Sequence, residues 1–254
     1  MTRPDRLLAA FVAATILSIS YAQNPEATVY TDPGTGIIFD TWNIQGNSKA
    51  GGLTFGMALP ETALESDASE LIGYLNCGSQ NSSTSKGWCG IALGGSMTNG
   101  LLFLAYPHKD KVMTSLRFTP KYTMPSVYTG NATVSQITSR VNATSFSVIF
   151  HCRDCLHWSQ NSTTGSAPTS SGLLDLGYAK SVDAPGNPSC PDEATIMRHD
   201  LGGTWTAMLD EAATDPSYNS WRSRANSTVS TCSNTSRLSM HGEIFHPRPV
   251  RLKL

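Results

Sequence analysis

Charged side chains are scarce in this sequence of 254 residues: Asp, Glu, Lys and Arg make up 15% of it, against about a quarter in typical globular domains. The formal net charge is −1, so the chain lacks the basic excess that binding to nucleic-acid phosphates requires. Few segments repeat apolar residues at the helical period, which excludes a helical bundle. Ser, Thr, Asn and Gly are abundant instead, as is typical of secreted β-rich proteins.

Signatures of several enzyme classes are also missing. The chain has no Gly-x-Ser-x-Gly, no His-Glu-x-x-His and no Gly-x-x-x-x-Gly-Lys-Ser/Thr motif. No Gly-x-Gly-x-x-Gly motif follows a strand pattern, so nothing indicates that this chain binds its own flavin or nicotinamide. Cys-x-x-Cys-His is absent, which excludes a covalently attached c-type haem. The sequence therefore gives no catalytic residue.

The first 22 residues have the pattern of a secretory signal peptide. A short basic start is followed by an apolar run over 7–19, and Ser20-Tyr21-Ala22 offers small residues at the cleavage positions. The run is too short to span a bilayer comfortably, and no second run of spanning length follows. We expect cleavage before Gln23 and a secreted, extracellular protein without a membrane span.

Six Asn-x-Ser/Thr sequons agree with secretion. Behind a signal peptide each of them is a candidate site of N-glycosylation. The six are Asn81, Asn131, Asn142, Asn161, Asn226 and Asn234.

Six cysteines follow the predicted signal peptide, and in an oxidising compartment they predict three disulfides. A Cys-x-x-Cys can also be redox-active or half of a zinc site, but no second Cys or His pair stands at a suitable spacing, so we favour a structural link. Local spacing favours one bond across a hairpin, one within a tight turn, and a third between the remaining pair: Cys77 with Cys89, Cys152 with Cys155, and Cys190 with Cys232.

Short runs rich in Val, Ile, Phe and Thr, broken by Gly, Pro and Asn, predict an all-β antiparallel sandwich or barrel. The polar segment 160–172 is low in complexity, and we expect a long exposed loop there. One domain over 23–222 and a basic, mostly flexible tail over 223–254 complete the prediction. The expected strands are 36–40, 53–58, 70–75, 87–93, 101–106, 111–118, 132–141, 145–151 and 173–179.

The segment from Trp88 to Phe103 is unusual. A predicted strand ends in Gly94 and Gly95, and Met97 follows at the rim of the strand. The thioether of methionine is a soft ligand for haem iron, although a methionine in such a place is more commonly a core residue. With eight methionines in the chain, spacing alone does not select Met97.

Together with other segments, this one resembles the haem b cytochrome domain of fungal cellobiose dehydrogenases and the related stand-alone, DOMON-like iron-reductase-type cytochromes. Leu-Gly-Gly-Ser-Met and Cys-x-x-Cys at their separation are fairly specific, whereas the histidine motif near 199 is looser. The resemblance covers most of the predicted mature chain. It rests on segments 30–39, 53–60, 70–73, 88–97, 125–133, 150–155 and 198–203, together with Trp158.

This resemblance implies an immunoglobulin-like β-sandwich that binds haem b non-covalently, with Met97 and His199 as the iron ligands. Two protein ligands leave no open position on the iron, so electron transfer is favoured over O₂ activation. Any histidine can instead be a surface or structural residue. His199 is favoured by its motif over its rivals, which are His108, His151, His157, His241 and His246.

Two further residues are candidates for contact with the haem. Tyr128 lies in the Tyr-Thr-Gly segment of the resemblance, where its ring would line the haem or its hydroxyl would reach a propionate; the alternative is a core tyrosine. Arg198 would pair with a propionate. Because adjacent residues of a strand point to opposite faces, Arg198 and His199 both face a haem only if the backbone there is irregular.

The function that the resemblance implies is single-electron transfer rather than the chemistry of a self-contained enzyme, with ferric reductase activity as one form of it. The expected donor is a separate flavin dehydrogenase or a small reductant, and the expected acceptor is ferric ion, a quinone or a copper polysaccharide monooxygenase. Such encounters are transient, and we expect a monomer. The alternative is a haem-free β-sandwich that acts as a carbohydrate-binding module.

Overall fold

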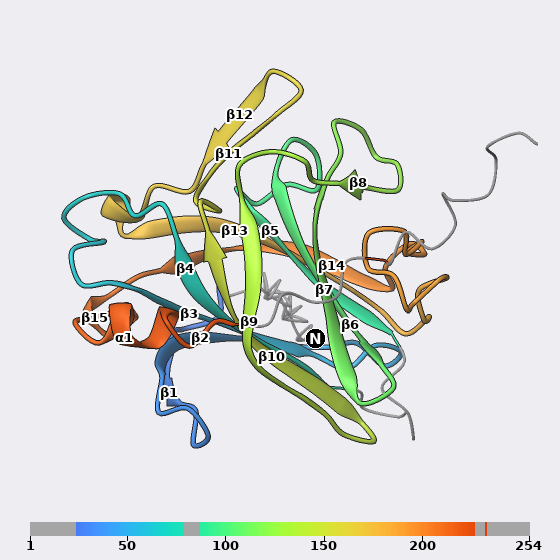
Figure 1. Ribbon diagram of the computed structural model, residues 1–254, viewed down its shortest axis with the longest axis horizontal. Coiled ribbons are helices and arrows are strands. Elements are labelled where there is room, and N and C mark those ends of the chain that lie inside the picture. Colours follow the sequence, from blue (N-terminus) through green and yellow to red (C-terminus); the bar gives the residue numbers. More distant parts are fainter. Residues whose placement is uncertain (1–23, 79–86, 227–231, 233–254) are drawn as a thin grey trace, which may run out of the picture.

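Two antiparallel β-sheets packed face to face make up the computed structural model, which describes residues 24–78, 87–226 and 232 (Figure 1). The predicted all-β sandwich is therefore confirmed. Among the described residues, no helix is long and apolar enough to cross a membrane. The predicted signal peptide, Asn81, Asn234 and most of the predicted tail lie outside the described residues.

The first sheet has the strand order β1-β2-β3-β4-β10-β9, and the second has the order β14-β13-β5-β6-β7-β8. The short strand β15 (Thr214–Asp215) pairs in parallel with β3. The first sheet consists of β1 (Thr28–Thr31), β2 (Ile38–Ile44), β3 (Leu53–Pro60), β4 (Leu71–Gly78), β10 (Ser145–Arg153) and β9 (Thr133–Val141). The second consists of β14 (Leu201–Met208), β13 (Leu173–Ser181), β5 (Trp88–Leu93), β6 (Leu101–His108), β7 (Lys111–Phe118) and β8 (Ser126–Val127).

Alternation along the strands decides which side chains fill the space between the sheets. On β5, Cys89, Ile91 and Leu93 point inward and belong to the main core, whereas the residues between them point outward. Phe103 of one sheet stacks on Phe150 of the other with ring centroids 3.8 Å apart. The core thus holds the two sheets in a fixed relation.

Covalent and polar links also cross the sandwich. Cys77 on β4 bonds to Cys89 on β5, and these strands belong to different sheets. The disulfide exists as predicted, but the expectation of a hairpin was wrong, because a sequence separation of 12 suits a connection that crosses between sheets as well. Beside it, Lys180 reaches across the interior to the carbonyl oxygens of Gly52 and Gly78. The structure also contains the predicted bonds Cys152–Cys155 and Cys190–Cys232.

The segment predicted as a long loop is partly a β-hairpin. Strands β11 (His157–Gln160) and β12 (Thr163–Ser166) pair through a two-residue turn, with φ of 50° at Asn161 and 65° at Ser162, as hairpin turns of this length require. A short 3₁₀ turn, η1 (Thr169–Ser171), follows. The hairpin projects from the sandwich (Figure 1), so its polar strands lack the apolar alternation that identifies a half-buried strand.

The end of the described chain returns to the outer face of the first sheet. After β14 come the 3₁₀ turn η2 (Glu211–Ala213) and the helix α1 (Tyr218–Arg222). Tyr218 and Trp221 of this helix are buried against Ile37 and Phe39. This small outer cluster holds α1 against the first sheet.

Candidate functional site

The outer face of the second sheet carries a strip of very small side chains. Three neighbouring strands contribute, and each supplies two outward positions separated by one inward residue. Cross-strand pairing sets Thr204, Gly177 and Ala92 in one row and Gly202, Ala179 and Gly90 in the next. We call these six residues the small-residue strip. None has a side chain longer than threonine; Gly202 and Thr204 are exposed, Gly90 and Ala179 are partly buried, and Gly177 and Ala92 are buried.

Two glycines of the strip are required by close approach. A Cβ atom on Gly177 would lie 3.0 Å from the carbonyl oxygen of Gly95 and 3.1 Å from the Cβ of Ala92. A Cβ atom on Gly202 would lie 2.9 Å from both Cε1 and Nδ1 of His199. Any other residue at these positions would displace the loop before β6 or the ring of His199.

Met97 lies at one end of the strip, half-buried in the loop 94–100 between β5 and β6. The loop begins with φ of +85° and +76° at Gly94 and Gly95, a conformation that glycine adopts without strain. At its far side Asn99 donates from its backbone N–H to Thr119 O (2.9 Å) and accepts from the indole of Trp158 (2.9 Å). The loop that carries Met97 is therefore held by hydrogen bonds at Asn99.

His199 lies at the other end of the strip. It is half-buried just before β14, and its ring lies over Gly202. Gly95 contacts the strip near Asp175, whereas Gly202 pairs with Ala179, four residues further along β13. At about 3.3 Å per residue the two levels are roughly 13 Å apart along the strand. Met97 and His199 thus border the same strip from opposite ends.

The next residue, Asp200, fastens this end. Its backbone N–H donates to Lys180 O (2.8 Å), and its side chain accepts from Val182 N (2.9 Å). The hydrogen bond from Lys49 lowers the pKa of the Asp200 carboxyl from its usual range, with further lowering from the Val182 and Ser181 donors. The carboxyl is therefore ionised at neutral pH.

Arg198 is exposed and makes no hydrogen bond or ion pair with another residue that the structure describes. Its guanidinium is available beside His199. Arg198 and His199 precede β14 rather than lying within it, which removes the alternation that would force them to opposite faces.

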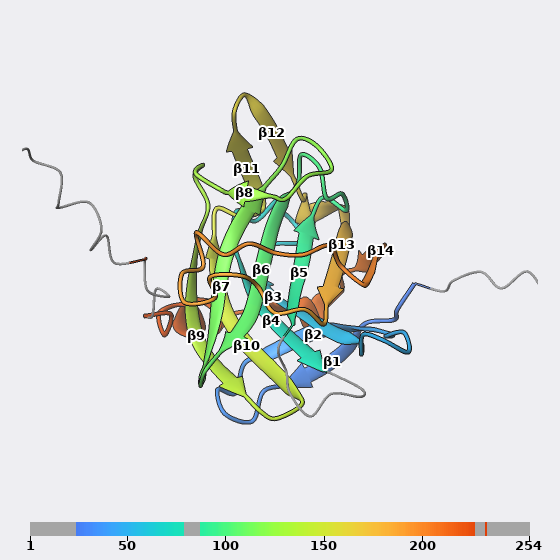
Figure 2. The same ribbon diagram turned by 90° about the vertical axis from the view of Figure 1, so that its right-hand side faces the viewer.

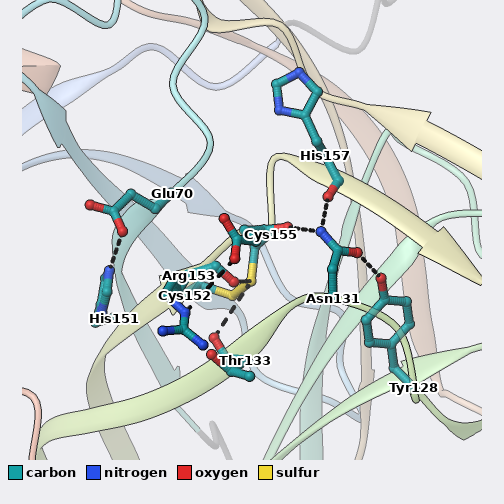
Figure 3. The surroundings of a disulfide bond; sticks show 10 residues. Glu70, Tyr128, Asn131, Thr133, His151, Cys152, Arg153, Cys155 and His157 are labelled. Atoms are coloured by element: carbon teal, nitrogen blue, oxygen red, sulfur yellow. Dashed lines mark hydrogen bonds and ion pairs between the residues drawn. A yellow bond between two sulfur atoms is a disulfide. The ribbon is translucent and has the colours of Figure 1, made fainter.

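Tyr128 lies elsewhere. Its ring is buried in the main core, and its hydroxyl is 2.6 Å from Asn131 Oδ1 and accepts from Ser159 N at 3.0 Å (Figure 3). The amide of Asn131 donates to the carbonyl oxygens of Asp154 (3.3 Å) and His157 (2.8 Å). This placement matches the alternative of a core tyrosine, and contact of Tyr128 with a haem stays a prediction.

The described rivals of His199 are also placed away from the strip. His151 pairs with Glu70 at 2.9 Å on the first sheet (Figure 3), and Arg222 binds the other oxygen of Glu70 at 2.5 Å. His108 ends β6, and His157 begins β11. His241 and His246 lie outside the described residues.

A cavity of about 380 Å³ opens at the Met97 end of the strip. Its polar wall includes Asp175, whose carboxylate accepts a hydrogen bond from Thr206 at 2.9 Å. Sequence reasoning missed both the cavity and the strip. The sequence does carry a signal for the strip: on each of three strands, two small residues are separated by one other residue. The cavity is lined by Asn24, Gly94, Gly95, Asp175, Thr204, Trp205 and Thr206.

The residues at the strip fit a haem. A thioether from Met97 and an imidazole from His199 form one of the donor pairs that hold haem iron in cytochromes. Gly177 and Gly202 make room for the Gly95 backbone and the His199 ring, which lie against them. The donor chemistry of Met97 and His199 fits the iron of a haem.

Residues 30–220 match the family model of the cytochrome domain of cellobiose dehydrogenase. The chain belongs to this family. The solved cytochrome domain of Myriococcum thermophilum cellobiose dehydrogenase shares 48% sequence identity, with a TM-score of 0.78 over 82% of this chain and all of that one. The cytochrome b domain of a Coprinopsis cinerea pyranose dehydrogenase shares the fold, with a TM-score of 0.63 at 22% identity over 79% of this chain and 96% of that domain.

Among curated proteins, the pyrroloquinoline quinone-dependent pyranose dehydrogenase of Coprinopsis cinerea is 26% identical over 204 residues. The match covers 77% of this chain and 26% of that protein, so the chain spans about a quarter of the length of this relative. Membership of a cytochrome family implies a haem cofactor. In both named relatives the cytochrome domain belongs to a dehydrogenase.

Proposed function

We propose that this cytochrome domain binds haem b through Met97 and His199 and transfers single electrons. The observation that carries the proposal is that the two segments which hold these residues, the loop 94–100 and the start of β14, border the small-residue strip at opposite ends. A Met/His pair raises the reduction potential relative to bis-histidine ligation and leaves no site for O₂. When bound, the haem supplies a reversible one-electron couple.

The protein residues then have distinct tasks. The pinned loop 94–100 presents Met97, the start of β14 presents His199, and Arg198 is free to pair with a propionate. Gly177 and Gly202 make room for the Gly95 backbone and the His199 ring. Preformed ligands reduce the reorganisation that accompanies electron transfer, since neither side chain has to be recruited.

The partners follow from the same reasoning. We propose that electrons come from a separate flavin or quinone-dependent dehydrogenase or a small reductant, and pass to ferric ion, a quinone or a copper polysaccharide monooxygenase. Secretion after removal of residues 1–22, and a single domain over 23–222, belong to this proposal. The family relationship to dehydrogenase cytochrome domains supports it.

The visible spectrum of the purified protein tests the proposal. Dithionite should sharpen the Soret band and produce α and β bands of a low-spin haem. Met97→Ala and His199→Ala should each give a high-spin or haem-poor protein. Met208→Ala and His157→Ala are matched controls, because Met208 is 66% exposed and His157 is also exposed. An unchanged spectrum in His199→Ala would show that another residue binds the iron.

A colourless protein after expression with added haem, retained by cellulose or chitin, would instead support the carbohydrate-binding module. Tyr122 is the one largely exposed aromatic side chain among the described residues. The surface therefore gives that alternative no row of aromatic rings.

A further inference from the structure

Asp200 joins three segments of the chain directly beside the proposed ligand His199. One carboxylate oxygen accepts hydrogen bonds from the backbone N–H of Val182 (2.9 Å) and the hydroxyl of Ser181 (3.1 Å). The other oxygen pairs with the ammonium group of Lys49 at 2.5 Å. The side chain of Asp200 is only 13% exposed, so these donors replace most of its contact with water.

The backbone of Asp200 is fixed as well. Its N–H donates to Lys180 O at 2.8 Å, and its carbonyl oxygen accepts from the amide of Asn47 at 3.2 Å. Lys180 belongs to β13, whereas Asn47 belongs to the loop between β2 and β3. Side chain and main chain are thus held by the same two segments, and the peptide bond that links Asp200 to His199 has little freedom.

The contacts of Asp200 are unequal in strength. Lys49 is 63% exposed, and ion pairs with an exposed partner contribute little to stability. The bonds from Val182 and Ser181 are charge-assisted and shielded, so they are the stronger ones. Loss of the carboxylate would also leave the Val182 N–H without this acceptor.

We propose that Asp200 is the positioning residue that holds His199 over the small-residue strip. This inference rests on the proposed function, because it takes His199 as a ligand of the haem iron. The carboxylate clamps the start of β14 to the end of β13, and Gly202 then provides the space in which the imidazole lies. Groups that orient a metal ligand typically change metal affinity 10- to 100-fold when removed.

Asp200→Ala tests the inference, with Asp183→Ala as the matched control. Asp183 is exposed near Lys49, and its carboxylate accepts no hydrogen bond from another described residue, so the control makes the same change of charge without opening the clamp. The measurements are the rate of haem loss to apomyoglobin, the low-spin fraction of the reduced spectrum, and the melting temperature of the haem-free protein.

We expect Asp200→Ala to lose haem at least about tenfold faster than wild type, with a reduced low-spin fraction that added imidazole restores. Asp200→Asn, which keeps one acceptor oxygen, should lie between. Asp183→Ala should match wild type. Wild-type haem retention and spectrum in Asp200→Ala would overturn the inference, and so would an equal loss in Asp183→Ala.

Two further variants separate the possible failures. If Asp200→Ala does not fold, Ser181→Ala combined with Lys49→Ala removes two of the three side-chain donors and decides the question by the same measurements. If His199→Ala keeps the wild-type spectrum, the ligand assignment itself is wrong. If His199→Ala loses the low-spin spectrum while Asp200→Ala keeps it, only the role of Asp200 is wrong.

Discussion

The outer faces of the two sheets differ in the size of their side chains and in how far other segments of the chain cover them. The first sheet presents large apolar side chains such as Phe39 and Ile149, and the chain covers them with Tyr218 and Trp221 of α1. The second sheet is covered over β6 and β7 by the 182–200 segment, which buries Ala194 there (Figure 2). Its other half carries the small-residue strip, where Gly202 and Thr204 remain exposed.

This difference follows side-chain size: large apolar side chains are covered by segments of the same chain, whereas a face of small side chains stays partly exposed. Large residues gain burial energy from any cover that the chain can supply, about 1.5–3 kcal/mol for each apolar side chain. Glycine and alanine offer little such gain, and the chain covers the strip only in part: Ala179 packs against the cluster that holds Ala194, whereas Gly202 and Thr204 stay exposed. Four predictions test the comparison, from the largest expected effect to the smallest.

Removing part of the cover of the first sheet should lower the free energy of unfolding and leave the haem spectrum unchanged. Trp221→Ala deletes a buried indole, and we expect the free energy of unfolding to fall by about 3 kcal/mol, since large-to-small changes at buried aromatics cost about 3–5 kcal/mol. Urea titration measures the fall, and the reduced spectrum should stay as in wild type. Asn219→Ala, on the exposed side of α1, is the control. A changed spectrum in Trp221→Ala would contradict the prediction that the outer face of the first sheet does not affect haem binding.

Larger side chains in the small-residue strip should weaken haem binding. Gly177→Val places side-chain atoms against the Gly95 carbonyl and Ala92, so we expect haem affinity to fall at least about tenfold, as for other supports of a metal site. Gly177→Ala should give a smaller loss. Gly78→Ala is the control, because a Cβ there meets nothing closer than 4.0 Å. Haem titration of the apoprotein measures the effect, and equal affinities of Gly177→Val and Gly78→Ala would contradict it.

A buried carboxyl of the first sheet should make stability depend on pH. Burial, and then the neighbouring Asp210 carboxylate, raise the pKa of Asp40 from 3.8 to about 6. The folded state therefore binds this proton more tightly than the unfolded state, and stability falls as pH rises from about 4 to about 6. Asp40→Asn should abolish that fall and raise stability at pH 7 by roughly 2 kcal/mol. Unfolding curves at pH 4 and pH 7 check this, and a constant difference between variant and wild type would refute it.

Tyr128 gives the smallest predicted effect and separates core from strip. Tyr128→Phe removes the hydroxyl between Asn131 and Ser159, which should cost about 1–2 kcal/mol of stability because buried partners lose a hydrogen bond. The spectrum and the reduction potential should not change. A shifted reduction potential with unchanged stability would indicate that Tyr128 contacts the haem, as the sequence resemblance implies.

The strands that are short apolar runs bounded by turn residues could be predicted from sequence. β3, β6 and β7 begin at their expected positions, and most residues of each are buried. β14 was missed as a strand, since Gly202 and Gly203 interrupt its apolar pattern. Those glycines weaken the strand signal for the same reason that they suit the site: they remove side chains from the sheet.

The candidate ligands came from the family resemblance, and only the pairing of β5, β13 and β14 shows what lies between them. No sequence pattern reveals register across three strands, so the small-residue strip was invisible until the sheet order was known. The predictions of a loop at β11–β12 and of a hairpin between Cys77 and Cys89 were wrong for a related reason. Both depend on where a segment goes in space, which local composition does not encode.

The bond between Cys190 and Cys232 closes a ring of chain that contains β14, η2, β15 and α1. A protease that cuts once inside this ring leaves both products joined through sulfur. Such a nicked protein would migrate as a single species in a non-reducing gel and would separate only after thiol treatment. Mass measurements on secreted material should therefore be made in both conditions before the chain is judged intact.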